Sequence, residues 1–338
     1  MIVLIFVVTL SILVFCHELG HFLAAKKVGV RVEEFGFGYP PRIWGKKKGK
    51  TLYSINAIPF GGFVRLTGQD AEYGMVGDAD SFAVKSPLKR AMVLLAGAAG
   101  NLLLGWFLFS LLFGVGMPEI LDRARVVVVE SDSVAAAAGI EPGDLITQID
   151  EQEIRFSWEV SDYVGSREGE EMWINLRRGD QELVVAATPR PLLGIQVSNV
   201  YLRKVSWFRA PWEGLREVGK TLGLMVQSLG GLLRNLLVHG EVPEEVAGPV
   251  GIAHVAKMYA ELGLRYFLQF MGILSLNLAL INLLPLPALD GGWLLFVLIE
   301  GVTRRRVNHK FEIWLHRIGM ILLISLMILI TIRDIGRF

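Results

Sequence analysis

The chain has 338 residues, of which 52% are hydrophobic, and its formal net charge at pH 7 is +1. Soluble proteins of this length are usually more polar, with about 45–50% apolar residues even when glycine is counted. The mean hydropathy of +0.47 therefore argues against an ordinary soluble protein. The single cysteine, Cys16, excludes a disulfide bond within the chain.

The first apolar segment, Met1–Ala25, is long enough to cross a membrane, which takes ~20 residues. It contains no charged residue before Cys16. A signal peptide would begin with a basic region and would have a shorter apolar stretch. We therefore expect a membrane helix that the mature protein retains.

Two histidines and a glutamate lie near the end of this segment, in the order His17-Glu18-Leu19-Gly20-His21. On a helix, residues four apart share one face, so His17 and His21 can both reach one metal ion. Glu18 is close enough to act on a water held by that metal, and H-E-x-x-H is the zinc-protease signature. The alternative is a chance match. However, an unpaired charge near the bilayer core costs about 2.5–3.5 kcal/mol, so ionisable groups there indicate function.

Three further segments have the length and composition of membrane helices: Ala91–Met117, Phe267–Leu284 and Phe311–Ile332. For each of them, a buried core helix is the alternative. That alternative is strongest for the third segment of the chain, Phe267–Leu284, because Pro285 and Pro287 follow it directly.

The charges between these segments predict an orientation. Lys and Arg outnumber Asp and Glu between residues 26 and 90, where Lys46–Lys48 form a basic run, and Arg304–Arg306 precede the last segment. The positive-inside rule places both basic loops in the cytosol. Acidic residues predominate between residues 118 and 210, which we expect on the outer side.

Residues 125–195 are predicted to form a small α/β module. Ser133 is expected to cap a short helix that Gly139 closes, and Gly179-Asp180 to join two strands. The expected elements are strand Val126–Glu130, helix Val134–Ala138, strand Leu145–Ile149, a helix around Trp158–Val164, and strands Met172–Arg177 and Glu182–Ala187.

This module resembles a bacterial PDZ domain in three stretches, Ser133-Val134-Ala135, Ala138-Gly139-Ile140 and Gly143-Asp144-Leu145-Ile146. Leu193-Gly194-Ile195 resembles the ligand strand of circularly permuted PDZ domains. Such domains bind peptides by adding a strand to a sheet edge. An inert spacer domain is the alternative.

The segment Pro211–His239 is predicted to be an amphipathic helix, because apolar residues such as Trp212, Leu215 and Leu222 recur on one face. It could lie flat on the outer membrane surface. The alternative is an ordinary helix packed on the outward domain.

Two histidines leave a catalytic zinc ion short of its usual three protein ligands. His17 and His21 lie roughly 25–31 Å along the first helix, near the inner edge of a ~30 Å membrane core. The third segment runs the same way and covers about 27 Å before Pro285 and Pro287 break it. Asp290 therefore reaches the same depth and is the best candidate for the third ligand. A helix cap outside the membrane is the alternative.

With these residues the chain resembles the site-2 protease family of intramembrane metalloproteases, in His17–His21 and in Asn282–Gly291. Further family stretches match at Gly36-Phe37-Gly38, Pro59–Val64 and Gly248-Pro249-Val250-Gly251. The resemblance covers nearly the whole chain and is greatest to the bacterial regulator-of-sigma-E proteases. Those proteins span the membrane four times and carry PDZ domains before the third span. This chain has one PDZ domain where some members have two.

The resemblance implies roles for the matching residues. His17, His21 and Asp290 would bind Zn²⁺, and Glu18 would be the general base. Asn282 would contact the substrate backbone, although it could instead cap the broken helix.

The resemblance also implies a membrane-dipping β-hairpin at Thr51–Leu66, beside the active site. Its residues Gly61, Gly62, Phe63 and Val64 would pair with unwound substrate backbone. An ordinary cytosolic hairpin is the alternative.

We therefore expect a polytopic α-helical membrane protein with four transmembrane helices, a membrane-dipping β-hairpin and one inserted, circularly permuted PDZ domain. The expected domains are the first half of the membrane metalloprotease core (1–117), the PDZ domain (118–200), the amphipathic helix (201–240) and the second half of the core (241–338).

The predicted function is zinc-dependent cleavage of transmembrane segments in single-pass membrane proteins, such as anti-sigma factors or remnant signal peptides. We expect it in the bacterial inner membrane, with the active site near the cytosolic side and the PDZ domain outside. The expected partners are these substrates and the lipid bilayer, without nucleic acid. The alternatives are an inactive scaffold that binds peptides through its PDZ domain, and a zinc transporter. The oligomeric state stays open.

Overall fold

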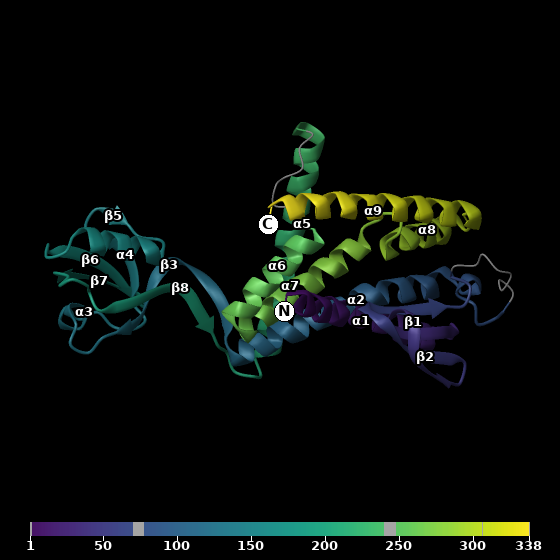
Figure 1. The fold of residues 1–338 in the computed structure, drawn as a ribbon, viewed down its shortest axis with the longest axis horizontal. Helices are drawn as coiled ribbons and strands as arrows, with labels where there is room; N and C mark the ends of the chain where they lie inside the picture. Colours follow the sequence, from purple (N-terminus) through teal and green to yellow (C-terminus); the bar gives the residue numbers. More distant parts are fainter. Residues whose placement is uncertain (1, 70–77, 240–247, 306, 338) are drawn as a thin grey trace. The chain divides into compact units, whose positions relative to one another are not determined.

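The chain forms two compact units in a computed structural model (Figure 1). The helical unit comprises Met1–Gly114 and Ser206–Phe338, and the β unit comprises Val115–Val205. The structure describes residues 2–69, 78–239, 248–305 and 307–337.

Within the described residues, four helices of the helical unit are long and apolar enough to cross a membrane, and the four predicted segments fall on them. They are α1 (Ile2–Val28), α2 (Pro87–Val115), α7 (Leu264–Leu283) and residues Lys310–Gly336 of α9 (His309–Arg337). The described part of this unit also contains α5 (Ala210–His239), α6 (Pro249–Leu262), α8 (Asp290–Thr303) and the short 3₁₀ helix η1 (Phe82–Val84).

Local sequence explains where α1 ends and where α2 begins. α1 stops before Gly29, which has a φ of 74°, a conformation that glycine adopts readily. The N–H of Val30 then donates to the carbonyl of Ala25 at 2.8 Å and satisfies one of the last helical carbonyls. α2 begins with Pro87, whose missing N–H would have no helical partner in the first turn.

Two long strands, β1 (Val32–Lys48) and β2 (Thr51–Leu66), form a small sheet that packs on α1. Within β1, Gly36 lies opposite both Phe63 and Ser54, so β1 lies between two halves of β2. The prediction of a hairpin made by Thr51–Leu66 alone is wrong in this respect. Its two arms pair with β1, because β1 supplies hydrogen-bonding groups on both of its edges.

Aromatic rings join this sheet to α1. The ring of Phe35 in β1 lies 5.6 Å from that of Phe15 and 4.7 Å from that of Phe22, measured between centroids. Tyr53 of β2 lies 6.0 Å from Phe22. Rings at these separations attract one another beyond the burial of their area. The sheet is therefore fixed beside the part of α1 that carries the histidines.

Helices α6 and α8 were not predicted as separate elements. α6 begins at Pro249, and the carboxylate of Asp334 in α9 accepts a hydrogen bond of 2.7 Å from the N–H of Gly251. This bond satisfies a free amide in the first turn of α6. α8 follows directly on the proline break after α7.

The predicted amphipathic helix is α5, which belongs to the helical unit. Its first turn packs on α2: Trp106 Nε1 donates to the carbonyl of Pro211 at 2.8 Å. The expected domain boundary between residues 240 and 241 lies outside the described residues.

The β unit is an antiparallel sheet with the strand order β7-β6-β4-β3-β8, and β5 pairs with β4. Val160 and Val164 of the second helix pack into its core. Its elements are β3 (Met117–Val129), α3 (Val134–Ala137), β4 (Leu145–Ile149), β5 (Gln152–Glu153), α4 (Ser157–Ser166), β6 (Met172–Arg178), β7 (Gln181–Ala187) and β8 (Ile195–Arg203).

Most of these elements lie within a few residues of their predicted positions. Ser133 caps α3 as predicted, since its side chain accepts a hydrogen bond from the N–H of Ala136. The strand predicted at Val126–Glu130 is only the end of β3, which begins at Met117. The early part of β3 pairs with β8, a contact between distant segments that no local pattern indicates.

Candidate metal and catalytic site

Two histidine side chains lie close together on one face of α1. The Nε2 atoms of His17 and His21 are 3.1 Å apart, and both residues are buried. Because a helix places residues four apart on the same face, this arrangement follows from the sequence spacing itself.

Asp290 reaches the histidines from the segment that joins α7 to α8. Its Oδ2 lies 2.9 Å from Nε2 of His17 and 3.1 Å from Nε2 of His21. Pro285 and Pro287 cannot continue α7, so the chain leaves the helix and starts α8 at Asp290. The structure thus brings together the three residues that the sequence predicts as metal ligands, with their ligand atoms within 4.8 Å of one another.

Helix α9 supports the segment that precedes Asp290. Ala288 has a φ of 75°, an uncommon conformation for a residue other than glycine. Its N–H donates to Nδ1 of His316 in α9 at 2.9 Å. The ring of His316 in turn stacks on that of Trp293 in α8, with 3.9 Å between centroids. These contacts determine the backbone course two residues before Asp290.

Helix α2 supports the two histidines from the other side. Nδ1 of His21 lies 2.8 Å from the carbonyl oxygen of Val93. A carbonyl can only accept, so this nitrogen carries the proton and leaves Nε2 free to bind a metal. The side chain of Asn101 lies 3.4 Å from Nδ1 of His17.

The donor set fits zinc. Two neutral imidazoles and one carboxylate are a common ligand set for catalytic zinc, and they leave a fourth position for water. Atoms bound to a tetrahedral zinc ion at about 2.0–2.2 Å lie roughly 3.3–3.6 Å from one another. The separations here are 2.9–3.1 Å, so a small widening admits the ion.

Glu18 lies beside the histidines and faces the small sheet. Its Oε2 accepts a hydrogen bond of 3.0 Å from the N–H of Val64 in β2. The bond therefore joins the predicted general base to one of the residues predicted to bind substrate.

Comparison with known families agrees with this geometry, since the model of peptidase family M50 matches residues 5–326. The chain belongs to peptidase family M50, the site-2 protease family. It is 33% identical over 331 residues to "Putative zinc metalloprotease CPE1693" of Clostridium perfringens, and the match covers 96% of each chain. It is 30% identical over 415 residues to "Zinc metalloprotease RasP" of Geobacillus kaustophilus, with 98% of this chain and 97% of the relative covered.

A solved structure is also similar to part of the chain. The PDZ domain of the SdrC-like protein from Listeria monocytogenes is 29% identical, with a TM-score of 0.21. The similarity covers 23% of this chain and 90% of that one. From its family and relatives, this M50 protein is a membrane-embedded zinc metalloprotease, and zinc is its cofactor.

The sequence reasoning missed the residues of α2 that line the site of the M50 protease. A Cβ atom on Gly97 would overlap Nε2 of His21 and would lie 2.7 Å from Cε1 of His17. A Cβ on Gly100 would overlap the carbonyl of Cys16. A signal was present in the sequence, because small residues in an apolar helix mark close helix contacts in membranes.

The predicted substrate-binding residues lie at two places in the M50 protease. Asn282 is half-buried in the last turn of α7. Gly61, with a φ of 81°, packs against Val14 of α1, and its N–H lies 3.4 Å from Oγ of Ser11. Gly62, Phe63 and Val64 follow Gly61 in β2.

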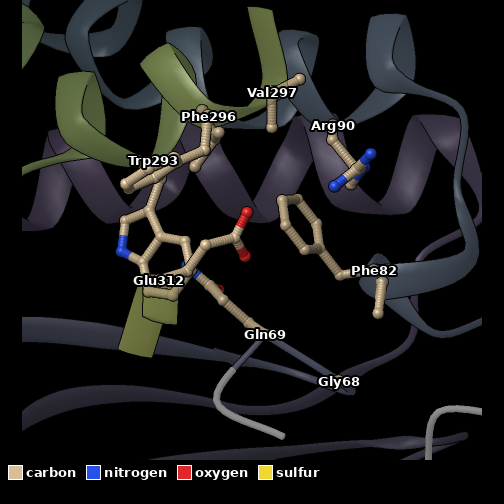
Figure 2. A pocket seen from close by; sticks show the side chains of 10 residues that line it. Gly68, Gln69, Phe82, Arg90, Trp293, Phe296, Val297 and Glu312 are labelled. Carbon is tan, nitrogen blue, oxygen red and sulfur yellow. The ribbon is translucent and has the colours of Figure 1, made fainter. Parts of the chain in front are cut away.

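A small cavity between α2, α8 and α9 does not suit a substrate (Figure 2). Its volume is about 20 Å³, which holds about one water. Figure 2 shows Arg90, Phe82 and Glu312 around it. Arg90 also forms an ion pair of 2.6 Å with Glu300, so these charges join α2 to α8.

Proposed function

We propose that this M50 protease cleaves transmembrane segments of single-pass membrane proteins at a zinc ion held by His17, His21 and Asp290. The observation that carries the proposal is the meeting of three ligand atoms within 4.8 Å, two of them on α1, which is long and apolar enough to cross a membrane. Anti-sigma factors and remnant signal peptides are the substrate classes that the family resemblance implies.

The chemistry follows from the problem that such a substrate poses. Water is scarce in a membrane, and each carbonyl of a helix is already hydrogen-bonded. Bound zinc would lower the pKa of a water to about 7 and polarise the scissile carbonyl. Glu18 would take the proton from that water and deliver it to the leaving amine. Burial of both histidines would keep bulk water away from the reacting groups.

The small sheet is proposed as the template for an unwound substrate. Residues Gly61, Gly62, Phe63 and Val64 lie in β2, where Val64 contacts Glu18, and would pair with an extended chain. A strand bound there would lie beside the general base, because the N–H of Val64 contacts Glu18. Asn282 would contact the substrate backbone from the end of α7.

The orientation and the domain division are part of the proposal. We place four membrane spans in the bacterial inner membrane, with Lys46–Lys48 in the cytosol and the β unit outside. The domain ranges are the first half of the core (1–117), the PDZ domain (118–200), the amphipathic helix (201–240) and the second half of the core (241–338).

The β unit is proposed to be a permuted PDZ domain that binds peptides. β8 is at the edge of its sheet, so one side of that strand is open to a further strand. A cavity of about 140 Å³ lies between the start of β8 and α4. Its lining residues are Glu130, Val160, Ser161, Val164, Leu192, Leu193, Gly194, Ile195 and Val197.

The test of the proposed function is the Glu18→Gln variant in lipid nanodiscs, with a single transmembrane segment as substrate. An amide has nearly the same shape but cannot accept the water proton. Cleavage should therefore fall roughly 10²–10⁴-fold, while bound zinc stays at one ion per chain. Glu261→Gln is the matched control, since its side chain is 56% exposed on α6. Wild-type cleavage by Glu18→Gln would contradict the mechanism. Zinc binding without cleavage by the wild type would favour the scaffold.

A further inference from the structure

Asn101 is a polar side chain deep inside the helical unit. It lies in the apolar helix α2 and is 0% exposed. Its backbone carbonyl oxygen, not its side chain, accepts a hydrogen bond of 2.8 Å from Oγ of Ser275 in α7. A buried amide is costly unless its polar atoms are paired, so its position needs an explanation.

The two polar atoms of this side chain are unequally paired. Nδ2 lies 3.4 Å from Nδ1 of His17, whereas Oδ1 is buried with no hydrogen-bond partner among the described residues. This arrangement suits a His17 ring whose proton is on Nε2. It does not suit a ring whose Nε2 binds a metal, because Nδ1 then carries the proton and needs an acceptor.

One rotation removes the conflict. The oxygen and nitrogen of an amide have nearly the same size, so turning the amide of Asn101 over exchanges their places. Oδ1 then lies where Nδ2 is, 3.4 Å from Nδ1 of His17. In that orientation the N–H of His17 donates to Oδ1, and Nδ2 takes the position that has no partner among the described residues.

We propose that Asn101 is a positioning residue, which accepts a hydrogen bond from Nδ1–H of His17 and so keeps Nε2 of His17 free for zinc. This inference rests on the proposed function, in which His17 is a zinc ligand. His21 also has an acceptor for its Nδ1–H, but this acceptor is the backbone carbonyl of Val93. α2 thus offers one acceptor to each histidine, and the acceptor for His17 is the one that a mutation can remove.

Two substitutions of Asn101 distinguish positioning from packing. Asn101→Leu keeps the volume but removes the acceptor, whereas Asn101→Asp keeps an acceptor and adds a charge. If Asn101 only fills space, leucine should be tolerated better than aspartate, because a buried charge is costly. If Asn101 positions His17, aspartate should retain zinc and leucine should lose it, since an acceptor on the second nitrogen supports metal-bound histidines.

The experiment measures the zinc dissociation constant of each purified variant by competition with a chelator, and the thermal unfolding of each zinc-free protein. Asn101→Leu should bind zinc about 10–100-fold more weakly. Asn101→Asp should stay within about threefold of the wild type, well short of that loss. Ser275→Ala is the control, because it removes a hydrogen bond to Asn101 without touching the His17 acceptor. It should bind zinc as the wild type does.

Three results would overturn the inference: wild-type zinc affinity in Asn101→Leu, a loss in Asn101→Asp as large as in Asn101→Leu, or an equal loss in Ser275→Ala. If Asn101→Leu does not fold, Asn101→Asp alone distinguishes the two roles. If Asn101 only fills space, the protein should bind zinc more weakly after this substitution, whereas if Asn101 positions His17, it should not. His17→Ala separates this inference from the proposed function. Full zinc binding by His17→Ala would remove His17 from the site, and the proposed function would then fail as well.

Discussion

His17 and His21 lie on the uninterrupted helix α1, whereas Asp290 follows an irregular segment between α7 and α8. The histidines are spaced by helix geometry, and α2 only orients their rings. The position of Asp290 depends on a proline break, a left-handed residue at Ala288 and a contact with α9. One side of the site is therefore set locally, and the other by tertiary contacts.

The difference suggests where each side is sensitive. A change near His17 and His21 should act through the distance between α1 and α2, because a Cβ atom on Gly20 or Gly100 would overlap a backbone carbonyl of the other helix. A change on the aspartate side should act through the loop, since a left-handed residue other than glycine costs about 1–2 kcal/mol and needs support. The following predictions test this contrast.

The largest effect is expected for Asp290→Ala. It removes a proposed ligand, so zinc affinity should fall by more than the roughly 10–100-fold typical of residues behind the ligands. Helix α1 does not depend on Asp290, so far-UV circular dichroism should be unchanged. Zinc content after dialysis, measured by atomic absorption, is the readout. Full zinc occupancy in Asp290→Ala would mean that Asp290 is not a zinc ligand.

Gly97→Ala tests the histidine side. The added methyl group would overlap Nε2 of His21 and would lie 2.7 Å from Cε1 of His17, so the histidine rings or the helix backbones would have to move. Overpacking of this kind costs about 1–3 kcal/mol, so both the melting temperature and the zinc affinity should fall. The matched control is Gly223→Ala in α5, where a Cβ meets nothing within 4 Å.

The control should change stability in the opposite direction. Alanine is favoured over glycine inside a helix by about 0.5–1 kcal/mol, so Gly223→Ala should melt slightly higher than the wild type. Equal melting temperatures for the two glycine variants would show that the α1–α2 contact is looser than described.

His316→Ala tests the support of the loop. The substitution removes the acceptor for the N–H of Ala288 and the ring that stacks on Trp293. Zinc affinity should fall about 10-fold, at the low end of the range for residues behind the ligands. Met320→Ala, one turn further along α9 and 46% exposed, is the control and should bind zinc normally. Unchanged affinity in His316→Ala would mean that the loop holds Asp290 without α9.

These contrasts also explain what the sequence could predict. The spacing of His17 and His21 is a local pattern, and the depth of Asp290 follows from helix length. The sequence therefore predicts that these residues meet. The sequence does not predict the hydrogen bond between His21 and the carbonyl of Val93, because a backbone carbonyl has no sequence signature. His316 was missed because it lies on a different helix, beyond α8, and nothing local links it to Ala288.

The same limit applies to the sheets. Local patterns located most strands of the β unit, but the pairing of β3 with β8 joins distant segments. Likewise, the position of β1 between the two halves of β2 depends on pairing that Thr51–Leu66 cannot reveal alone. Side-chain alternation predicts a strand, whereas the choice of its partner depends on the whole sheet.

The smallest change in stability is expected for Asp80→Asn. Asp80 forms an ion pair with Arg31, which lies just after α1. Arg31 Nε donates to Asp80 at 2.9 Å, and Nη2 donates to its other oxygen at 2.6 Å. Hydrogen bonds from Arg31, and then from Lys50, hold the pKa of Asp80 well below its ordinary value of 3.8. A lowered pKa in the folded state means that this contribution to stability is present above about pH 4 and is lost as pH falls below it.

Zinc-free wild type and Asp80→Asn should therefore differ slightly in melting temperature at pH 6, and the difference should shrink as the pH is lowered toward 3. Using the zinc-free protein removes the separate effect of losing bound zinc when the histidines are protonated. Zinc affinity at pH 7 should be the same in both proteins, because Asp80 contacts neither side of the site. If the difference in melting temperature instead grew toward acid pH, the lowered pKa of Asp80 would not be a source of stability. Weaker zinc binding in Asp80→Asn would mean that the histidine side depends on the chain beyond α1, and the contrast with the loop that carries Asp290 would then be lost.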